Sequence, residues 1–196
     1  MPDAIAEVIE SSTRQFTAEV YREVDPPAFG SWVRVPHDNG TTLFALVSHV
    51  EMNSYEPNRR TVALGKTNDE LRREMPQVME LLRTTVRAQV LACTDADGTF
   101  RQTLPPQPPG IHDFVYPCTE EHVRQIGPPF DFIRTLVQQP DPAVPVDDLL
   151  VAVLQRIREA YGEEGGTEAL ISAGRSLSRL LDDDHERLQS ILRRVT

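Results

Sequence analysis

The N-terminal stretch Ala4-Ile5-Ala6-Glu7-Val8-Ile9 decides the fold, because it opens a series of segments in which apolar and polar residues alternate. A second alternating segment covers residues 16–21 and ends at Asp25-Pro26-Pro27, and two more cover residues 30–35 and 42–50. A period of two between turn residues is typical of strands with one buried face. The front of the chain is therefore predicted to form a curled antiparallel sheet.

Turn residues separate the strands that follow. Asn39-Gly40 is a pair that tight hairpin turns prefer, because it accepts positive φ. The other predicted elements are a polar loop over residues 51–60, a short strand over 61–64, strands over 86–93 and 99–102, a stiff proline-rich crossover over 104–109, and a last strand over 111–116. These segments predict a small antiparallel β-barrel, which we expect to be six-strand-like.

Helical signals appear once inside this region and throughout the C-terminal part. Thr67 and Glu70 have the spacing of a capping box, and Pro76 is expected to interrupt or restart the helix that they begin. Beyond Pro117-Cys118 the apolar residues follow helical spacing, with joints expected at residues 140–145 and 163–166 and one helix ending at Tyr161-Gly162. The predicted class is α+β, with a β-barrel domain over residues 1–118 and an α-helical bundle over residues 119–196.

Charge and cysteine content limit the classes of function. The 196 residues carry a net charge of -10, spread over both predicted domains, which opposes direct binding to a phosphate backbone. Two cysteines without metal-ligand spacing are expected to be free thiols in a reducing compartment. The chain shows no leader peptide and no apolar run of the roughly 20 residues that span a bilayer, so we expect a soluble cytoplasmic protein without membrane contact.

None of the motifs that imitate chemical sites is complete. Gly65-Lys66-Thr67 resembles the end of a phosphate-binding loop, but Arg60 stands where the loop needs its first glycine. Asp95-Ala96-Asp97-Gly98 fits a hairpin turn better than a calcium loop, and Asp182-Asp183-Asp184-His185 fits a helix start better than a metal site. His112-Asp113 are neighbours whose side chains are expected on opposite faces of a strand. We therefore predict no catalytic, cofactor-binding or metal-binding residues.

Residues 4–118 resemble the HAS-barrel family, the small β-barrel of HerA-type DNA translocases and rotary ATP synthase subunits. The stretches that carry the resemblance are residues 6–16, residues 29–35, residues 43–50, Arg87-Ala88-Gln89-Val90-Leu91-Ala92, and the Pro-Pro-Gly that precedes Ile111. In that family an ATPase core follows the barrel, whereas only 78 residues follow Cys118 here. The resemblance implies a barrel that mediates assembly and partner docking, in the translocases with a NurA-type nuclease.

From these observations we expect a non-catalytic assembly or adaptor protein without cofactors, linked to a DNA end-processing machine through a HerA-type ATPase or a NurA-type nuclease. The interaction residues expected are Trp32, Phe44, Arg59 and Arg60, and the oligomeric state stays open. One alternative is a nucleic-acid-binding barrel with a face of arginines, for which the candidates are Arg14, Arg34, Arg59, Arg60, Arg72 and Arg73. Another is a small enzyme with a cleft that joins His49 or His112 to carboxylates.

Overall fold

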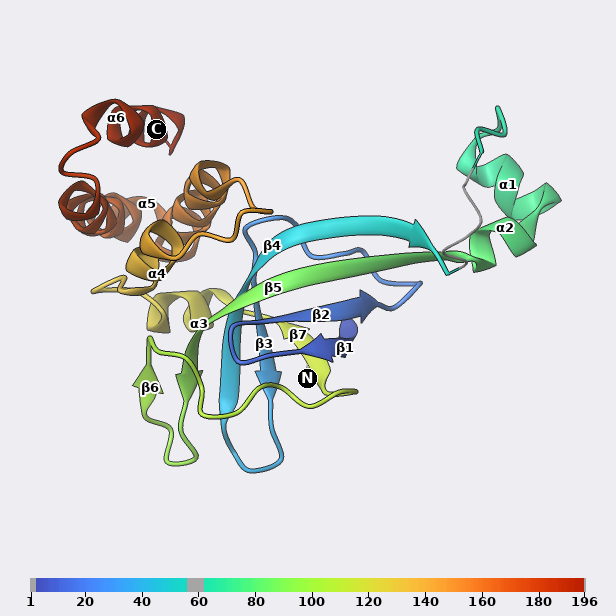
Figure 1. Ribbon diagram of the computed structural model, residues 1–196, viewed down its shortest axis with the longest axis horizontal. Coiled ribbons are helices and arrows are strands. Elements are labelled where there is room, and N and C mark those ends of the chain that lie inside the picture. The colour runs from blue at the N-terminus through green and yellow to red at the C-terminus, as the bar shows by residue number, and fades with distance from the viewer. Residues whose placement is uncertain (1–2, 56–61, 196) are drawn as a thin grey trace.

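The computed structural model describes residues 3–55 and 62–195 and has an α+β fold (Figure 1). Six antiparallel strands close into a barrel in the order β2-β1-β7-β3-β4-β5, and pairing between β2 and β5 completes the ring. The bounds are β1 Ala6–Ser11, β2 Gln15–Val20, β3 Trp32–Pro36, β4 Thr42–Ser54, β5 Leu82–Thr94 and β7 Phe114–Pro117. A short strand, β6 (Phe100–Arg101), pairs with β5 outside the ring. The closed barrel predicted from the alternating segments is confirmed.

The local turn chemistry agrees with the sequence. Gly40 adopts a φ of 85° in the β3–β4 turn, the left-handed conformation that favours glycine. Gly98 has the same φ in the turn between β5 and β6. Inward-facing side chains of the barrel strands form a core cluster of their own, made mostly of alanine and valine with Phe16 as its largest member. Small residues fit the narrow interior of a barrel with few strands.

Two expected elements around residue 55 differ from the structure. The polar residues 51–54 do not form a loop, because β4 continues through them to Ser54 and pairs with β5, which begins at Leu82. Residues 62–64 lie in no strand. The alternation signal fails here because this part of the β4–β5 ribbon extends beyond the barrel, where both faces meet solvent and polar side chains are tolerated on either one.

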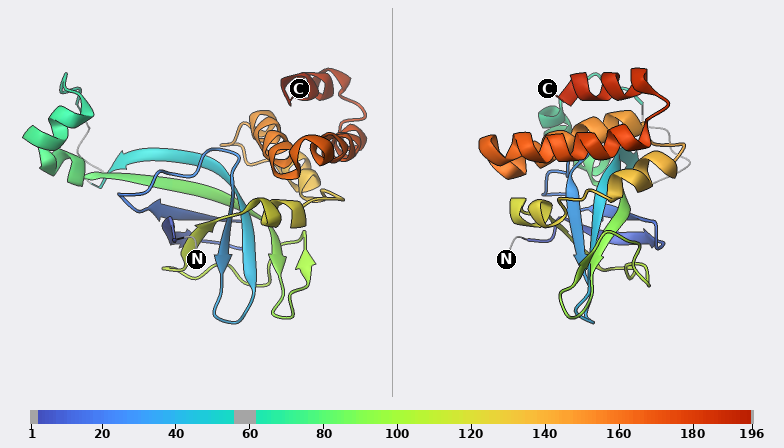
Figure 2. Two further views of the ribbon diagram at one scale, coloured as in Figure 1. Left: turned by 180° about the vertical axis from the view of Figure 1, so that it is seen from behind. Right: turned by 90° about the vertical axis from the view of Figure 1, so that its left-hand side faces the viewer.

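The ribbon ends in two short helices, α1 (Asn68–Glu74) and α2 (Pro76–Glu80). Thr67 and Glu70 form the predicted capping box, since each side chain bonds the backbone N–H of the other residue. Pro76 is the first residue of α2, so it restarts the helix as expected. Figures 1 and 2 show the ribbon and its helices projecting from the barrel, on the side opposite the C-terminal helices. We call residues 49–55 and 62–85 the arm.

The C-terminal part consists of α3 (Glu120–Gln125), α4 (Phe132–Gln138), α5 (Val146–Leu180) and α6 (His185–Val195). Within α5, Gly162 has non-helical angles (φ 70°, ψ -175°), and the predicted helix end at Tyr161-Gly162 coincides with this break. The joint expected at residues 163–166 is wrong, because the chain is helical again directly after Gly162. None of the described helices combines the length and the apolar character that crossing a bilayer demands.

A second hydrophobic cluster joins the helices to the outside of the barrel. Trp32, Phe44 and Leu46 point outward from β3 and β4 and pack with residues of α3, α4 and α5. The ring of Trp32 meets that of Phe132 edge-on, with 5.1 Å between ring centroids and an angle of 87° between ring planes. Edge-to-face aromatic pairs of this kind contribute about 1 kcal/mol beyond the area that they bury. The helical part is therefore packed on the barrel rather than tethered to it.

Gly30 marks the closest approach of the barrel to α5. Its φ is 78°, and a Cβ added there would meet the Cβ of Ala152 closer than two carbon atoms can approach. Gly30→Ala is expected to destabilise the fold by about 2–4 kcal/mol, from left-handed strain and overpacking together. Thermal denaturation followed by circular dichroism measures the loss.

The matched control is Gly98→Ala, because Gly98 has a similar φ of 85° but no atom within 4 Å of the added Cβ. This variant is expected to lower the free energy of unfolding by about 1–2 kcal/mol, because it introduces left-handed strain without overpacking. Equal losses in the two variants would show that the contact between the barrel and α5 does not restrict position 30.

Candidate functional site

The histidines proposed for a catalytic cleft lie on the surface in different parts of the molecule. His49 is exposed on the arm, and its Nε2 lies 3.8 Å from a carboxylate oxygen of Glu51. His112 is exposed on the barrel, and its Nδ1 lies 2.5 Å from a carboxylate oxygen of Glu7. Each ring meets one carboxylate in contact with solvent, without the desolvation that tunes a catalytic pair.

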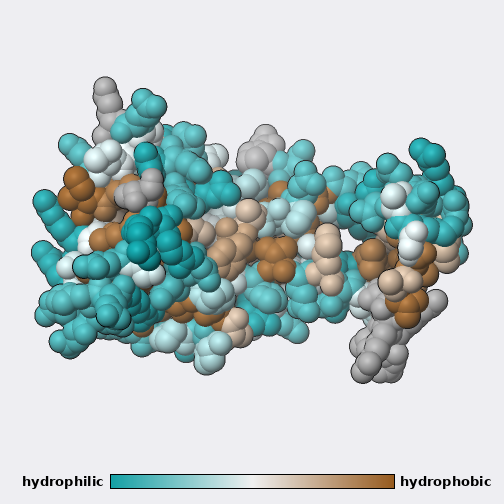
Figure 3. Space-filling model, turned by 90° about the horizontal axis from the view of Figure 1, so that it is seen from above, coloured by the Kyte–Doolittle hydropathy of each residue, from teal (hydrophilic) through white to brown (hydrophobic). Residues whose placement is uncertain are grey.

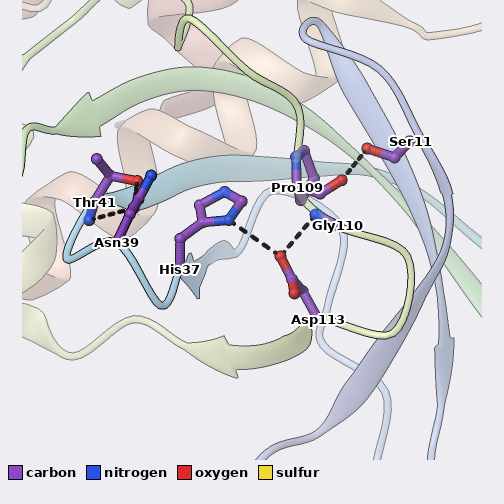
Figure 4. Close-up of polar contacts among 7 residues, drawn as sticks. All are labelled: Ser11, His37, Asn39, Thr41, Pro109, Gly110 and Asp113. Atoms are coloured by element: carbon purple, nitrogen blue, oxygen red, sulfur yellow. Dashed lines mark hydrogen bonds and ion pairs between the residues drawn. The ribbon is translucent and has the colours of Figure 1, made fainter.

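Asp113 belongs to a polar cluster that fastens the proline-rich crossover to the barrel (Figure 4). Its carboxylate accepts a hydrogen bond from the Gly110 N–H at 2.7 Å and lies 3.3 Å from Nδ1 of His37. The Ser11 hydroxyl donates to the Pro109 carbonyl at 2.5 Å. These contacts join strands β1 and β3 to the crossover, and they account for His37 and Asp113 as structural residues.

The motifs that imitate phosphate, calcium and metal sites have structural roles. Lys66 forms an ion pair with Glu74 on the arm. Asp97 accepts a hydrogen bond from the Thr99 N–H at 2.9 Å within its turn, and Asp184 accepts one from the Arg187 N–H at 3.1 Å at the start of α6. Over residues 3–55 and 62–195, no three His, Cys, Asp or Glu side chains are grouped so that they could hold a metal ion.

Both cysteines are free, and burial suppresses their ionisation. It raises the pKa of Cys118 to about 12 and also raises the pKa of Cys93, to which the charge of Asp95 contributes. Because the thiolate is the reactive form, neither residue has the character of a nucleophile at neutral pH.

The residues expected to bind a partner lie in very different places. Trp32 and Phe44 are 4% and 2% exposed, and both pack under the C-terminal helices. A partner reaches them only when these helices move away, so their predicted role in binding stays a prediction. Arg59 and Arg60 lie outside the described residues.

The other arginines proposed for a nucleic-acid face do not gather on one surface. Arg14 lies at the β1–β2 turn, and Arg34 lies on the outside of β3 with its guanidinium 4.9 Å from the centroid of the Tyr116 ring. Arg72 and Arg73 lie on α1, at the end of the arm. This distribution gives no observation that favours a nucleic-acid interface.

Among the described residues, half of the ten exposed large apolar side chains lie on the arm, and apolar patches are visible on it in Figure 3 as well as elsewhere on that face. Met52 on β4 is 75% exposed and Val62 at the end of the arm is 72% exposed. Val50, Tyr55 and Leu64 are also exposed, and neither α1 nor α2 contains a buried residue. Exposed apolar groups that gather on one projecting element are typical of interaction sites.

The register of the ribbon explains how its faces are built. Val50 lies opposite Val86, whose side chain is buried in the barrel, and Met52 lies opposite Thr84 on the same face. This face of the arm therefore continues the inner face of the barrel. On the other face the Arg83 guanidinium lies 5.3 Å from the centroid of the Tyr55 ring. The sequence predicted a loop over residues 51–60 and gave no alternation signal for the arm.

No protein-family model matches this chain, and no curated protein matches it either.

A hydrogen bond between Thr119 and His122, at the junction of the barrel and the C-terminal helices, is sensitive to acid. Nδ1 of His122 accepts this hydrogen bond from the Thr119 N–H at 3.1 Å, which caps α3, and its ring centroid lies 5.9 Å from that of Phe44. Burial, together with the charge of Arg34, lowers the pKa of His122. The cap requires a neutral ring, because a protonated nitrogen cannot accept.

Because the pKa of His122 is lower in the folded protein than in the unfolded chain, its contribution to stability is present above about pH 6.5 and declines as the pH falls below that value. His122→Gln is expected to keep the cap, since glutamine occupies this position in capping boxes, and to flatten the dependence of melting temperature on pH between about 7.5 and 5.5. His185→Gln, which removes an exposed histidine, serves as the control and is expected to keep the wild-type slope. An unchanged slope in His122→Gln would contradict the assignment.

Proposed function

We propose that this protein is a non-catalytic assembly protein whose arm binds a protein partner. The observation that carries the proposal is that the two helices at the end of the arm are short and leave their apolar side chains incompletely buried. The helices α1 and α2 contain 7 and 5 residues, and Leu71, Val78 and Met79 on them, together with Met75 between them, are all incompletely buried. Helices this short are not stable in water by themselves, and their stability comes from packing of an apolar face. A partner that covers these side chains supplies that packing.

The body of the molecule suits the role of a platform. The barrel is closed, so its strands offer few open edges, and one hydrophobic cluster fixes the helical part to it. A rigid body with one projecting element directs binding to that element.

We further propose that the barrel is of the HAS type, followed by a helical bundle, and that it acts in DNA end processing with a HerA-type ATPase or a NurA-type nuclease as partner. The closed six-stranded antiparallel barrel supports this proposal at the level of architecture.

An armless variant tests the docking role. Glu51 and Thr85 face each other across the ribbon, so residues 52–84 are replaced by Asn-Gly, which closes a two-residue hairpin. The variant is expected to keep the barrel, because the inward-facing Val86 is retained. It is expected to lose at least tenfold in affinity for HerA-type or NurA-type proteins of the same cell, measured by pull-down and then by calorimetry with the purified partner.

Two point variants separate docking from general surface effects. Val62→Asp places a charge at the end of the arm, whereas Ile171→Asp changes a residue of similar size and 50% exposure on α5. Only Val62→Asp is expected to weaken binding. If the armless protein retains every partner of the full-length protein, docking through the arm is wrong.

A further inference from the structure

Strand β4 extends past β3, the strand that pairs with it on one side. The ladder between β3 and β4 begins at Trp32, which lies opposite Leu46. The last backbone hydrogen bonds across this side run from the Gly30 N–H to the Val47 carbonyl at 2.8 Å and from the Val47 N–H to the Ser31 carbonyl at 2.9 Å. Beyond them, residues 49–53 are all exposed, and no described residue pairs with β4 on this side. We call residues 49–53 the open edge.

The pairing with β5 determines which backbone groups the open edge presents. The Tyr55 N–H donates to the Leu81 carbonyl at 2.9 Å, so the residues of β4 that bond to β5 here are Tyr55 and every second residue before it. Val50 and Met52 alternate with these residues and do not bond to β5. Their N–H and C=O groups therefore point away from β5, toward solvent.

Glu51 is the one acidic residue on the open edge, which otherwise has few of the features that protect strand edges against pairing with another strand. The open edge contains no proline and no lysine, and Val50 and Met52 place two apolar side chains on one face. A β-bulge lies at Val47–His49, but it precedes the edge and leaves residues 50–53 in regular register with β5. Edge strands of this kind add a further strand readily.

We propose that the open edge pairs antiparallel with the open edge of a second copy of this chain, about a two-fold axis at Met52. This inference rests on the proposed docking role of the arm and names the occupant of one of its surfaces. An axis at Met52 joins the two Met52 residues by their free backbone groups and brings their side chains into contact. It also places the carboxylate of Glu51 opposite the amide of Asn53, which can donate to it.

The neighbouring registers fit less well. An axis at Glu51 places two carboxylates directly opposite each other, which is destabilising. An axis at Val50 brings residue 53 of the second copy against Val47, whose N–H and C=O already bond to Ser31 and Gly30. An axis at Asn53 separates the two Met52 side chains, the most exposed large apolar groups on the edge. For a second copy on this edge, the self-complementary pair Glu51 and Asn53 and the occupied backbone groups of Val47 thus favour the register with its axis at Met52.

An antiparallel arrangement also affects the end of the arm. The arm of each copy then runs back along the other copy, so that α1 and α2 of one point toward the barrel of its partner.

The test uses the full chain and measures its mass in solution by light scattering and sedimentation. Wild-type protein is expected at twice the chain mass of 22.1 kDa. Met52→Pro removes an N–H that points to the open side and spares the ladder with β5, so the variant is expected at the mass of a monomer. Val50→Lys provides a second variant, because lysine on an open edge opposes pairing without a change in the backbone.

Cross-linking tests the register. Met52→Cys is expected to form a disulfide-linked dimer on mild oxidation or with a short bismaleimide, since the two residues lie at the axis. Ile171→Cys, also exposed, is expected to stay uncross-linked. Of the native cysteines, Cys93 is buried and Cys118 is partly buried, and the raised pKa of each disfavours its reactive thiolate. A monomeric wild type, or a Met52→Cys variant that cross-links no second copy, overturns the pairing. If the wild type is monomeric but the armless variant still loses its protein partners, the docking function is supported and the self-pairing is wrong.

Discussion

The ladder between β2 and β5 is the interaction on which the rest of the structure depends. Six residues of β2, from Gln15 to Val20, pair with residues 84–89 of β5, and this pairing turns a sheet into a closed ring. Closure buries the inner faces of all six strands around one narrow core. It also fixes the direction in which β5 leaves the barrel. Because β4 follows β5 along its whole length, the arm inherits that direction.

The strands β3 and β4 serve two cores at once. Val33 and Val35 face the barrel interior, whereas Trp32 and Phe44 face the C-terminal helices. A strand with apolar residues on both faces is typical of a sheet that is covered on both sides. The consequence is that the barrel and the helical part share strands, and neither core is complete without β3 and β4.

The sequence predicted the elements whose signals are local. The Asn39-Gly40 turn, the capping box of Thr67 and Glu70, and the restart at Pro76 depend on residues close in sequence, and the structure has all three. Barrel closure followed from regular alternation in the strands. The arm did not follow, because its strands have solvent on both faces and lack alternation. Nor could the direction in which Trp32 and Phe44 face be predicted, since that depends on contacts with residues far away in sequence, such as Phe132, which lies 100 positions after Trp32.

The continuity of β4 and β5 from barrel to arm has a mechanical consequence. Each strand is 13 residues long and belongs to both parts, without a loop or a glycine hinge between them. A pull on the end of the arm along its axis therefore loads the ladders inside the barrel in shear, and many hydrogen bonds resist at the same time instead of opening one after another. Tension applied to the end of the arm is thereby transmitted into the body of the molecule with little extension.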